Sequence, residues 1–237
     1  MKIYEAMAKV FHSLDLGTCF ALLGDANMHW AGALSDLGAR FIYTRHEHVA
    51  VAAATAYARN SGKLGFATVT CGPGLTQVMT ILPIAVRARV PLVLFAGEAP
   101  LHKEWYNQMI DQAPFVQACG AHYVPLHDPE TIIQDAINAV QHATQKRMPV
   151  VLGVPFDLQK QDFSGDFSNL KGTFKFPKLD DVHPKDNAIQ SVAALLQNTE
   201  KTIIFAGMGA TSDYARKLIV ELADVTGSLL ATTLPAK

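Results

Sequence analysis

Residues 40–59 read RFIYTRHEHVAVAAATAYAR and contain the end of one structural element and the start of the next. Residues 40–43 are a short run of strand-forming side chains, and residues 49–58 are small, apolar and uncharged. The stretch therefore predicts a β-strand, a tight connection and a helix that is packed on every side. A strand followed closely by a buried helix is the repeating unit of α/β proteins.

The same alternation continues in both directions along the chain. Short runs rich in Val, Ile, Leu and Phe alternate with segments of helical periodicity. This pattern favours an α/β fold with a six-stranded parallel sheet, right-handed crossovers and helices on both faces. The predicted strands are 19–23, 40–43, 65–69, 91–96, 122–125 and 149–154, and the helices predicted between them include 28–37, 49–59, 75–89 and 129–144.

The alternation stops after Pro155. Residues 156–183 are polar, rich in Gly, Ser, Asp and Lys, and follow neither period, which is typical of a linker. We therefore predict a first domain at 1–160, a linker at 161–183 and the start of a second, Rossmann-like domain at 184–237. Two strands (202–206 and 228–232) and two helices cannot cover a sheet on both faces, so we expect the second domain to be incomplete.

Composition narrows the function classes. The 237 residues carry a formal net charge of −1, and the basic residues are spread along the chain, so the sequence lacks the footprint of nucleic-acid binding. The three cysteines lie far apart, as is typical of reduced thiols in a cytoplasmic protein. No apolar run approaches the roughly 20 residues of a membrane helix. We expect a cytoplasmic protein with a small-molecule partner, and neither nucleic acid nor membrane.

Glu47 admits two interpretations. Thr44 and Glu47 form the T-x-x-E pattern of a capping box, which satisfies backbone N–H groups at a helix start. Alternatively, Glu47 lies at the carboxyl end of a strand, where open parallel sheets bind their ligands. A second strand–turn–helix segment contains Gly-Pro-Gly at 72–74, and glycines let a backbone approach a ligand closely. By itself this turn is weak evidence for a site.

Taken in order, these segments resemble the pyrimidine-binding domain of thiamine-diphosphate-dependent enzymes of the acetolactate synthase, pyruvate decarboxylase and benzaldehyde lyase type. The resemblance starts with Arg-His-Glu at 45–47, the alanine-rich helix and the Gly-Pro-Gly turn. It continues with PLVLFAG at 91–97, NQMID at 107–111 and MPVVLGVP at 148–155. Residues 204–237 resemble the start of the family's central Rossmann-like domain, so the resemblance spans essentially the whole chain.

The resemblance implies roles for individual residues. Glu47 matches the catalytic glutamate that hydrogen-bonds N1′ of the aminopyrimidine and thereby promotes activation of C2 of the thiazolium. Gln108 matches a polar residue that reaches the neighbouring subunit's active site, and His46 is expected to help position Glu47. Four residues match the turn that borders the aminopyrimidine: Gly72, Pro73, Gly74 and Gln77.

Some positions depart from the family pattern. Gln77 stands where many members have Asn, and Met109 stands where Glu is common. Three residues replace the family's usual loop after the first strand and are expected at the substrate end of the site: Asp25, Asn27 and His29. These departures argue against identity with acetolactate synthase itself and leave the cofactor assignment intact.

The resemblance implies thiamine diphosphate as cofactor, with Mg²⁺ bound beside the diphosphate through a GDG motif and a later Asn. This sequence contains no GDG, so we expect the diphosphate and Mg²⁺ on a domain absent from this chain, and no metal ligand here. FAD occupies the central domain of some members and is left open.

The implied function is decarboxylation or carboligation of a 2-oxo acid or aldehyde through a C2 carbanion or enamine, by a homodimer or homotetramer. One alternative is a non-catalytic fragment, or a subunit of a split enzyme whose partner carries the diphosphate and Mg²⁺ domain. A weaker alternative is a nucleotide-binding oxidoreductase domain built on Gly207-x-Gly209. Its fingerprint is incomplete because Ser212 occupies the third small-residue position.

Overall fold

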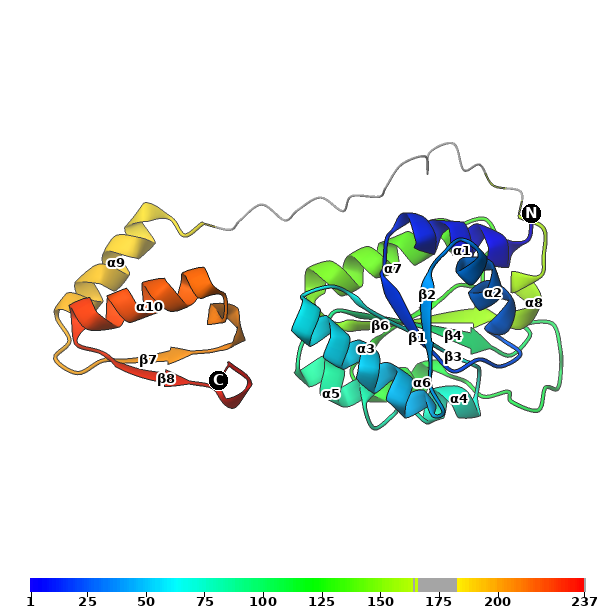
Figure 1. Cartoon of the computed structure of the whole chain (residues 1–237), viewed down its shortest axis with the longest axis horizontal. Helices are drawn as coiled ribbons and strands as arrows, with labels where there is room; N and C mark the ends of the chain where they lie inside the picture. Colours follow the sequence, from blue (N-terminus) through cyan, green and yellow to red (C-terminus); the bar gives the residue numbers. More distant parts are fainter. Residues whose placement is uncertain (164, 166–182, 237) are drawn as a thin grey trace. The chain divides into compact units, whose positions relative to one another are not determined.

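The computed structural model describes residues 1–163, 165 and 183–236 (Figure 1). The chain divides into two compact units, Met1–Lys178 and Leu179–Lys237, and each unit is described by itself. Most of the predicted linker at 161–183 lies outside the described residues. The domain boundaries proposed from the sequence therefore stay predictions.

The first unit is built on a six-stranded, all-parallel sheet with the strand order β2-β1-β3-β4-β6-β5. The predicted fold class, α/β with a six-stranded parallel sheet between helices, is confirmed. Observed strand ends lie within two residues of the predicted ones. The strands are β1 (Thr18–Ala21), β2 (Arg40–Tyr43), β3 (Gly65–Val69), β4 (Leu92–Glu98), β5 (His122–Pro125) and β6 (Pro149–Pro155).

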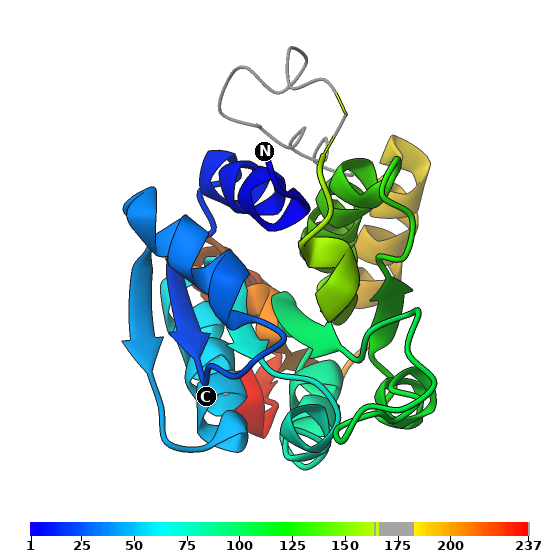
Figure 2. The same ribbon diagram turned by 90° about the vertical axis from the view of Figure 1, so that its right-hand side faces the viewer.

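Helices cover both faces of this sheet, and Figure 2 shows them as two layers with the strands between. One core cluster joins α1, α2 and α7 to the sheet, and a second joins α3, α5 and α6 to the opposite face. No helix in the described ranges is long and apolar enough to span a membrane. The helices are α1 (Ile3–Ser13), α2 (Met28–Asp36), α3 (Glu47–Ser61), α4 (Pro73–Thr76), α5 (Leu82–Arg87), α6 (Ala113–Ala118), α7 (Ile132–Lys146) and α8 (Phe156–Gln159).

Alternation along the central strands divides their side chains between the two clusters. In β4, Val93 and Phe95 pack in the first cluster, while Leu92 and Leu94 pack in the second. Both faces of a central parallel strand are buried, so its sequence is continuously apolar. Successive side chains nevertheless pack against opposite layers of helices. The first cluster is aromatic at its centre, where the rings of Trp30 and Phe95 stack with centroids 4.0 Å apart.

The single helix predicted at 75–89 is wrong. The structure has α4 and α5 there, separated by a turn over residues 77–81. In this turn the backbone N–H groups of Val78 and Met79 bond to carbonyls three residues earlier, at Leu75 and Thr76. Pro83 explains the break, because its ring and its missing N–H are tolerated in the first turn of a helix but disrupt a helix interior.

The second unit contains a two-stranded parallel sheet, β7 paired with β8, and two longer helices. These elements were predicted with ends within about two residues. Large apolar side chains stay exposed in this unit, for example Ile203 and Phe205 on β7, each 67% exposed. The elements are α9 (Asp186–Gln197), β7 (Ile203–Ala206), η2 (Met208–Ala210), α10 (Asp213–Thr226), β8 (Leu229–Thr232) and η3 (Leu234–Ala236).

Candidate functional site

The sheet topology selects one place for a ligand site. From β1 the chain passes to β2 on one side, whereas β3 pairs with β1 on the other side. This reversal is a topological switch point, and open parallel sheets bind ligands beyond the carboxyl ends of the strands there. The loops after β1 and β3 meet at this point, since Leu22 N–H donates to Thr68 O at 3.1 Å and Ala26 N–H reaches Thr70 Oγ1 at 3.5 Å.

Glu47 places a carboxylate at the carboxyl ends of these strands. It is the first residue of α3, and its side chain is 16% exposed. Its carboxylate accepts no hydrogen bond from any described residue, and its nearest cation-forming group is His46 Nδ1 at 4.0 Å. A mostly enclosed carboxylate without a donor is costly to bury, so the site favours an incoming group that can donate a hydrogen bond.

The capping-box interpretation of Glu47 is wrong. The N-cap of α3 is His46, whose Nδ1 accepts a hydrogen bond from His48 N–H at 3.1 Å. Thr44 lies outside the helix, and its hydroxyl donates to the carbonyls of Ala21 and His46. Glu47 therefore occupies the first helical position instead of the third, and local helix capping does not account for it.

The Gly-Pro-Gly turn lies beside Glu47. Gly72 has φ 59° and ψ −112°, a conformation open essentially to glycine, and a β-carbon there would lie 2.0 Å from Gln108 O. A β-carbon on Gly74 would lie 3.6 Å from Glu47 Oε1 and 2.8 Å from Thr70 Cγ2. Gly72 thus lets the turn pack against the Gln108 backbone, and Gly74 lets it pass close to Thr70 and the Glu47 carboxylate.

The loop between β4 and α6 covers this turn. Gln108 lies in this loop, with its backbone carbonyl against Gly72 and its Oε1 accepting from Cys71 Sγ at 3.3 Å. Its predicted reach into a neighbouring subunit's active site stays a prediction. Burial is the main cause of the raised pKa of the Cys71 thiol, so it stays a neutral donor. Met109, noted as a departure from the family pattern, is 40% exposed.

The three predicted substrate-end residues have different surroundings. Asn27 is buried, and its amide is committed to Gly24 N–H, Leu22 O and Thr68 Oγ1, so it braces the loop after β1. The ring of His29 lies between Tyr4 and Phe156, with centroids 5.7 and 6.2 Å away. Asp25 is exposed, and its substrate contact stays a prediction.

Asp25 also lies near a buried hydroxyl in the covering loop. Tyr106 Oη is buried and has no hydrogen-bond partner among the described residues. Burial raises the pKa of Tyr106, and Cys71 and Asp25 raise it further. The structure therefore gathers Glu47, the 72–74 turn, Gln108 and Asp25 at one edge of the sheet.

Gln77 is exposed just after α4, away from these hydrogen bonds.

A second polar group at the same edge was not predicted. Glu98, the last residue of β4, accepts hydrogen bonds from Tyr123 Oη and pairs with His127 Nε2 at 2.5 Å. Burial, followed by the Glu98 charge, raises the pKa of Tyr123 far above its usual range, so Tyr123 remains a neutral donor. A charged residue at the end of an apolar strand was the available signal for Glu98, whereas its partners come from distant segments.

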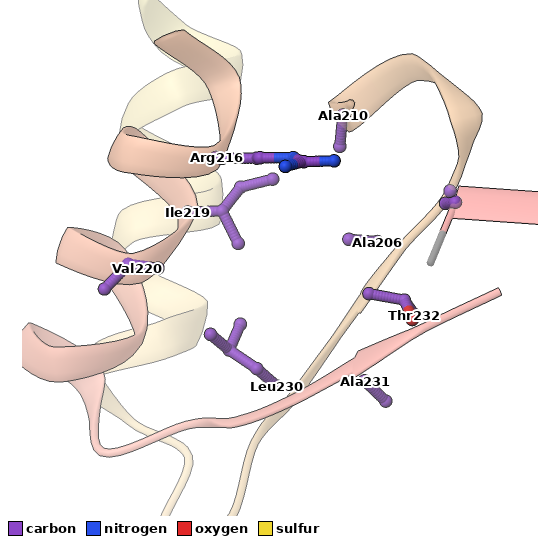
Figure 3. Close-up of a pocket in the computed structure, with 10 residues that line it drawn as sticks. Ala206, Ala210, Arg216, Ile219, Val220, Leu230, Ala231 and Thr232 are labelled. Carbon is purple, nitrogen blue, oxygen red and sulfur yellow. The ribbon is translucent and has the colours of Figure 1, made fainter. Parts of the chain in front are cut away.

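The second unit holds a separate cavity of about 420 Å³, shown in Figure 3. It opens after β7, where Gly207 and η2 form the predicted glycine turn, and Ser212 Oγ caps α10 by accepting from Ala215 N–H at 3.1 Å. Arg216 points from α10 toward Ala210 across the opening. Binding of FAD or another nucleotide here stays a prediction.

The sequence of the first unit is similar to that of a known family of cofactor-binding domains. Residues 1–115 match the family model described as thiamine pyrophosphate enzyme, N-terminal TPP binding domain. The chain is 29% identical over 243 residues to a probable acetolactate synthase large subunit of Methanocaldococcus jannaschii, covering 100% of this chain and 41% of that protein. It is 29% identical over 237 residues to the chloroplastic acetolactate synthase of Arabidopsis thaliana, covering 97% of this chain and 35% of that protein.

A relative with a different name shares a shorter region. The mouse protein 2-hydroxyacyl-CoA lyase 2 is 36% identical over 160 residues, which cover 65% of this chain and 25% of that protein. The chain thus spans between a quarter and about two fifths of the length of these relatives. All of them overlap the unit that carries Glu47.

Proposed function

The chain belongs to the thiamine pyrophosphate enzyme family, and we propose that its first unit holds the aminopyrimidine half of thiamine diphosphate (thiamine pyrophosphate) against Glu47. One observation carries this proposal. The Glu47 carboxylate is mostly enclosed, lacks a donor among the described residues, and lies beside the 72–74 turn, where a β-carbon on Gly74 would be 3.6 Å from its Oε1. A flat heterocycle with a nitrogen that shares a proton fits this combination of acceptor and open backbone.

The residues of this chain would bind and protonate the cofactor. Glu47 would share a proton with the pyrimidine ring nitrogen, donating it as the acid and accepting the ring N–H as the carboxylate, a task that suits a carboxyl group held at the start of a helix. The 72–74 turn would support the ring through its backbone, and the 99–112 loop would exclude water from it. When bound, thiamine diphosphate supplies the chemistry for breaking or forming a carbon–carbon bond next to a carbonyl.

For the complete reaction we propose an acetolactate-synthase-like decarboxylase or carboligase acting on a 2-oxo acid or aldehyde. The names of the relatives support a lyase or transferase of this general class. The diphosphate and Mg²⁺ would be held by a region outside the residues of this chain, either in the same polypeptide or in a partner subunit.

Deuterium exchange at C2 of thiamine diphosphate tests the role of Glu47. The protein, together with the region or partner subunit that holds the diphosphate, is incubated with Mg²⁺ and the cofactor in D₂O, and the C2 proton signal is followed by NMR. Glu47→Gln keeps the size of the side chain but cannot cycle a proton, so exchange should slow by about a hundredfold or more. Glu104→Gln, in the exposed part of the covering loop, is the matched control and should behave as wild type. Exchange that survives Glu47→Gln refutes the proposal.

We also propose that the protein works as a homodimer or homotetramer in the cytoplasm. The outward face of α3 supports close packing of a second copy, because Val49 and Ala56 are exposed there and small. Sedimentation at micromolar concentration tests this proposal, and a monomer under those conditions contradicts it.

A further inference from the structure

Gln112 is a buried polar residue that links two segments of the candidate site. It lies immediately before α6 and is 2% exposed. Its Oε1 accepts from Gly72 N–H at 2.8 Å, and its Nε2 donates to Gly97 O at 3.1 Å. An N–H can only donate and a carbonyl can only accept, so these two partners determine the orientation of the amide.

Both partners of Gln112 are tightly confined. Gly72 is pressed between this amide and the backbone of Gln108, where a β-carbon would lie 2.0 Å from Gln108 O. Gly97 lies against the loop after β1, where a β-carbon would lie 2.3 Å from Ala26 Cβ. Gln112 therefore couples the turn after β3 to the end of β4 at a point where neither backbone segment has room to shift toward its neighbour.

The end of β4 is itself braced. Glu98 follows Gly97 directly and is held by Tyr123 Oη and His127 Nε2 from the β5 side. The Glu98 side chain is 14% exposed, so these donors compensate a largely buried charge. A connected set of hydrogen bonds thus extends from β5 through Glu98 and the β4 backbone to Gln112 and the 72–74 turn.

We propose that Gln112 is a positioning residue for the cofactor. Its amide fixes the position of the 72–74 turn, so that an aminopyrimidine ring resting on the turn is within hydrogen-bond distance of Glu47. The inference rests on the proposed function. Without the amide, Gly72 N–H loses its acceptor, and the turn that faces Glu47 is free to move. The hydrogen bonds of Gln112 go to backbone groups of Gly72 and Gly97, so its effect on the cofactor acts through the backbone of the turn.

A matched control exists in the same unit. Gln159 is 1% exposed, and its Nε2 donates to Ala26 O at 2.8 Å and to Val154 O at 3.1 Å. It is a second buried glutamine that ties two backbone segments together, but neither of its hydrogen bonds goes to Gly72 or Gly97. Gln159→Ala should therefore cost stability without specifically moving the 72–74 turn.

The first measurement uses the full chain without cofactor. Hydrogen exchange of the Gly72 amide, followed by NMR, should accelerate about tenfold or more in Gln112→Ala, as expected for the loss of one hydrogen bond. The same amide should exchange at the wild-type rate in Gln159→Ala once the two variants are compared at equal global stability. Equal acceleration in both variants, or none in Gln112→Ala, overturns the inference.

The second measurement is the affinity for thiamine diphosphate with Mg²⁺ of the protein together with the region that holds the diphosphate, followed through the backbone amide shifts of Glu47, Gly72 and Gly74. Gln112→Ala should weaken binding about tenfold, corresponding to one lost hydrogen bond, and Gln159→Ala less than about twofold. Wild-type shifts that are absent from these residues overturn the proposed function and this inference together. Wild-type binding with equal affinities for both variants overturns this inference alone.

A pH profile of Gln112→Glu separates positioning from mere folding. A protonated carboxyl group has the same shape as the amide and can still accept from Gly72 N–H and donate to Gly97 O, whereas a carboxylate cannot donate. The titratable or charged groups around it include Glu98 with its partner His127, Asp111, Tyr123, and Cys71 with the nearby Asp25; the carboxylates among them favour its protonated form.

Relative to wild type at each pH, the affinity of Gln112→Glu should approach the wild-type value near pH 5.5 and fall about tenfold by pH 8. This variant also serves if Gln112→Ala does not fold. Gln159→Glu should lose stability over the same range while its relative affinity stays level. A flat affinity ratio for Gln112→Glu contradicts the positioning role.

Discussion

Replacing Gly72 by alanine should destabilise the first unit far more than an ordinary glycine substitution. Gly72 has φ 59° and ψ −112°, which costs a non-glycine residue about 1–3 kcal/mol. The new β-carbon would also lie 2.0 Å from Gln108 O, so the turn or the covering loop must move and the bond from Gly72 N–H to Gln112 breaks. Leaving the buried Gly72 N–H and Gln112 Oε1 without a hydrogen-bond partner costs about a further 1–3 kcal/mol. We expect a total loss of roughly 2–6 kcal/mol.

Gly62 provides the comparison, because it has φ 71° and nothing within 4 Å of the β-carbon position. Gly62→Ala should therefore cost only the backbone term, about 1–2 kcal/mol. Both tryptophans of the chain, Trp30 and Trp105, belong to the first unit, so urea unfolding followed by their fluorescence reports on it alone. If the two variants lose the same stability within about 0.5 kcal/mol, the close approach of Gln108 does not constrain the turn.

Phe11→Ala should lower the unfolding free energy of the first unit by about 3–5 kcal/mol in the same assay, since Phe11 is 1% exposed against Trp30. Burial raises the pKa of the Cys19 thiol, so a thiol reagent at pH 8 should label Cys19 far more slowly before unfolding than after it. Lys2 lowers the pKa of Asp162, so their pair stabilises the fold above about pH 4 and is lost as the pH falls through the lowered value. Lys2→Met should restore an ordinary pKa for Asp162 in an NMR titration, and an unchanged value contradicts this pairing.

Sequence reasoning captured the features that depend on local pattern. Strand and helix periodicity predicted the six-stranded parallel sheet, because continuous apolar runs are stable only where both faces of a strand are covered. The stretch RHE followed by an alanine-rich helix indicated Glu47 as a site residue, since a carboxylate at the start of an otherwise uncharged helix is recognisable from the sequence alone. Pattern alone did not reveal the break near Pro83, because the apolar period continues through the turn.

Tertiary structure excluded the capping-box interpretation of Glu47 and showed which residues surround its carboxylate. The capping-box pattern at 44–47 is real in the sequence, yet the helix starts at Glu47, and only the folded chain shows that the carboxylate faces Gly74 instead of its own backbone. Gln112 and the Glu98 pair were invisible beforehand because their partners are brought together by crossovers between strands. The sequence by itself thus determined the elements and one acid, through periodicity and composition. Packing decided how closely the 72–74 turn approaches the covering loop and where the buried Gln112 amide lies. Hydrogen bonds between residues about 40 positions apart produce no periodic pattern in the sequence, so they could not be predicted from it.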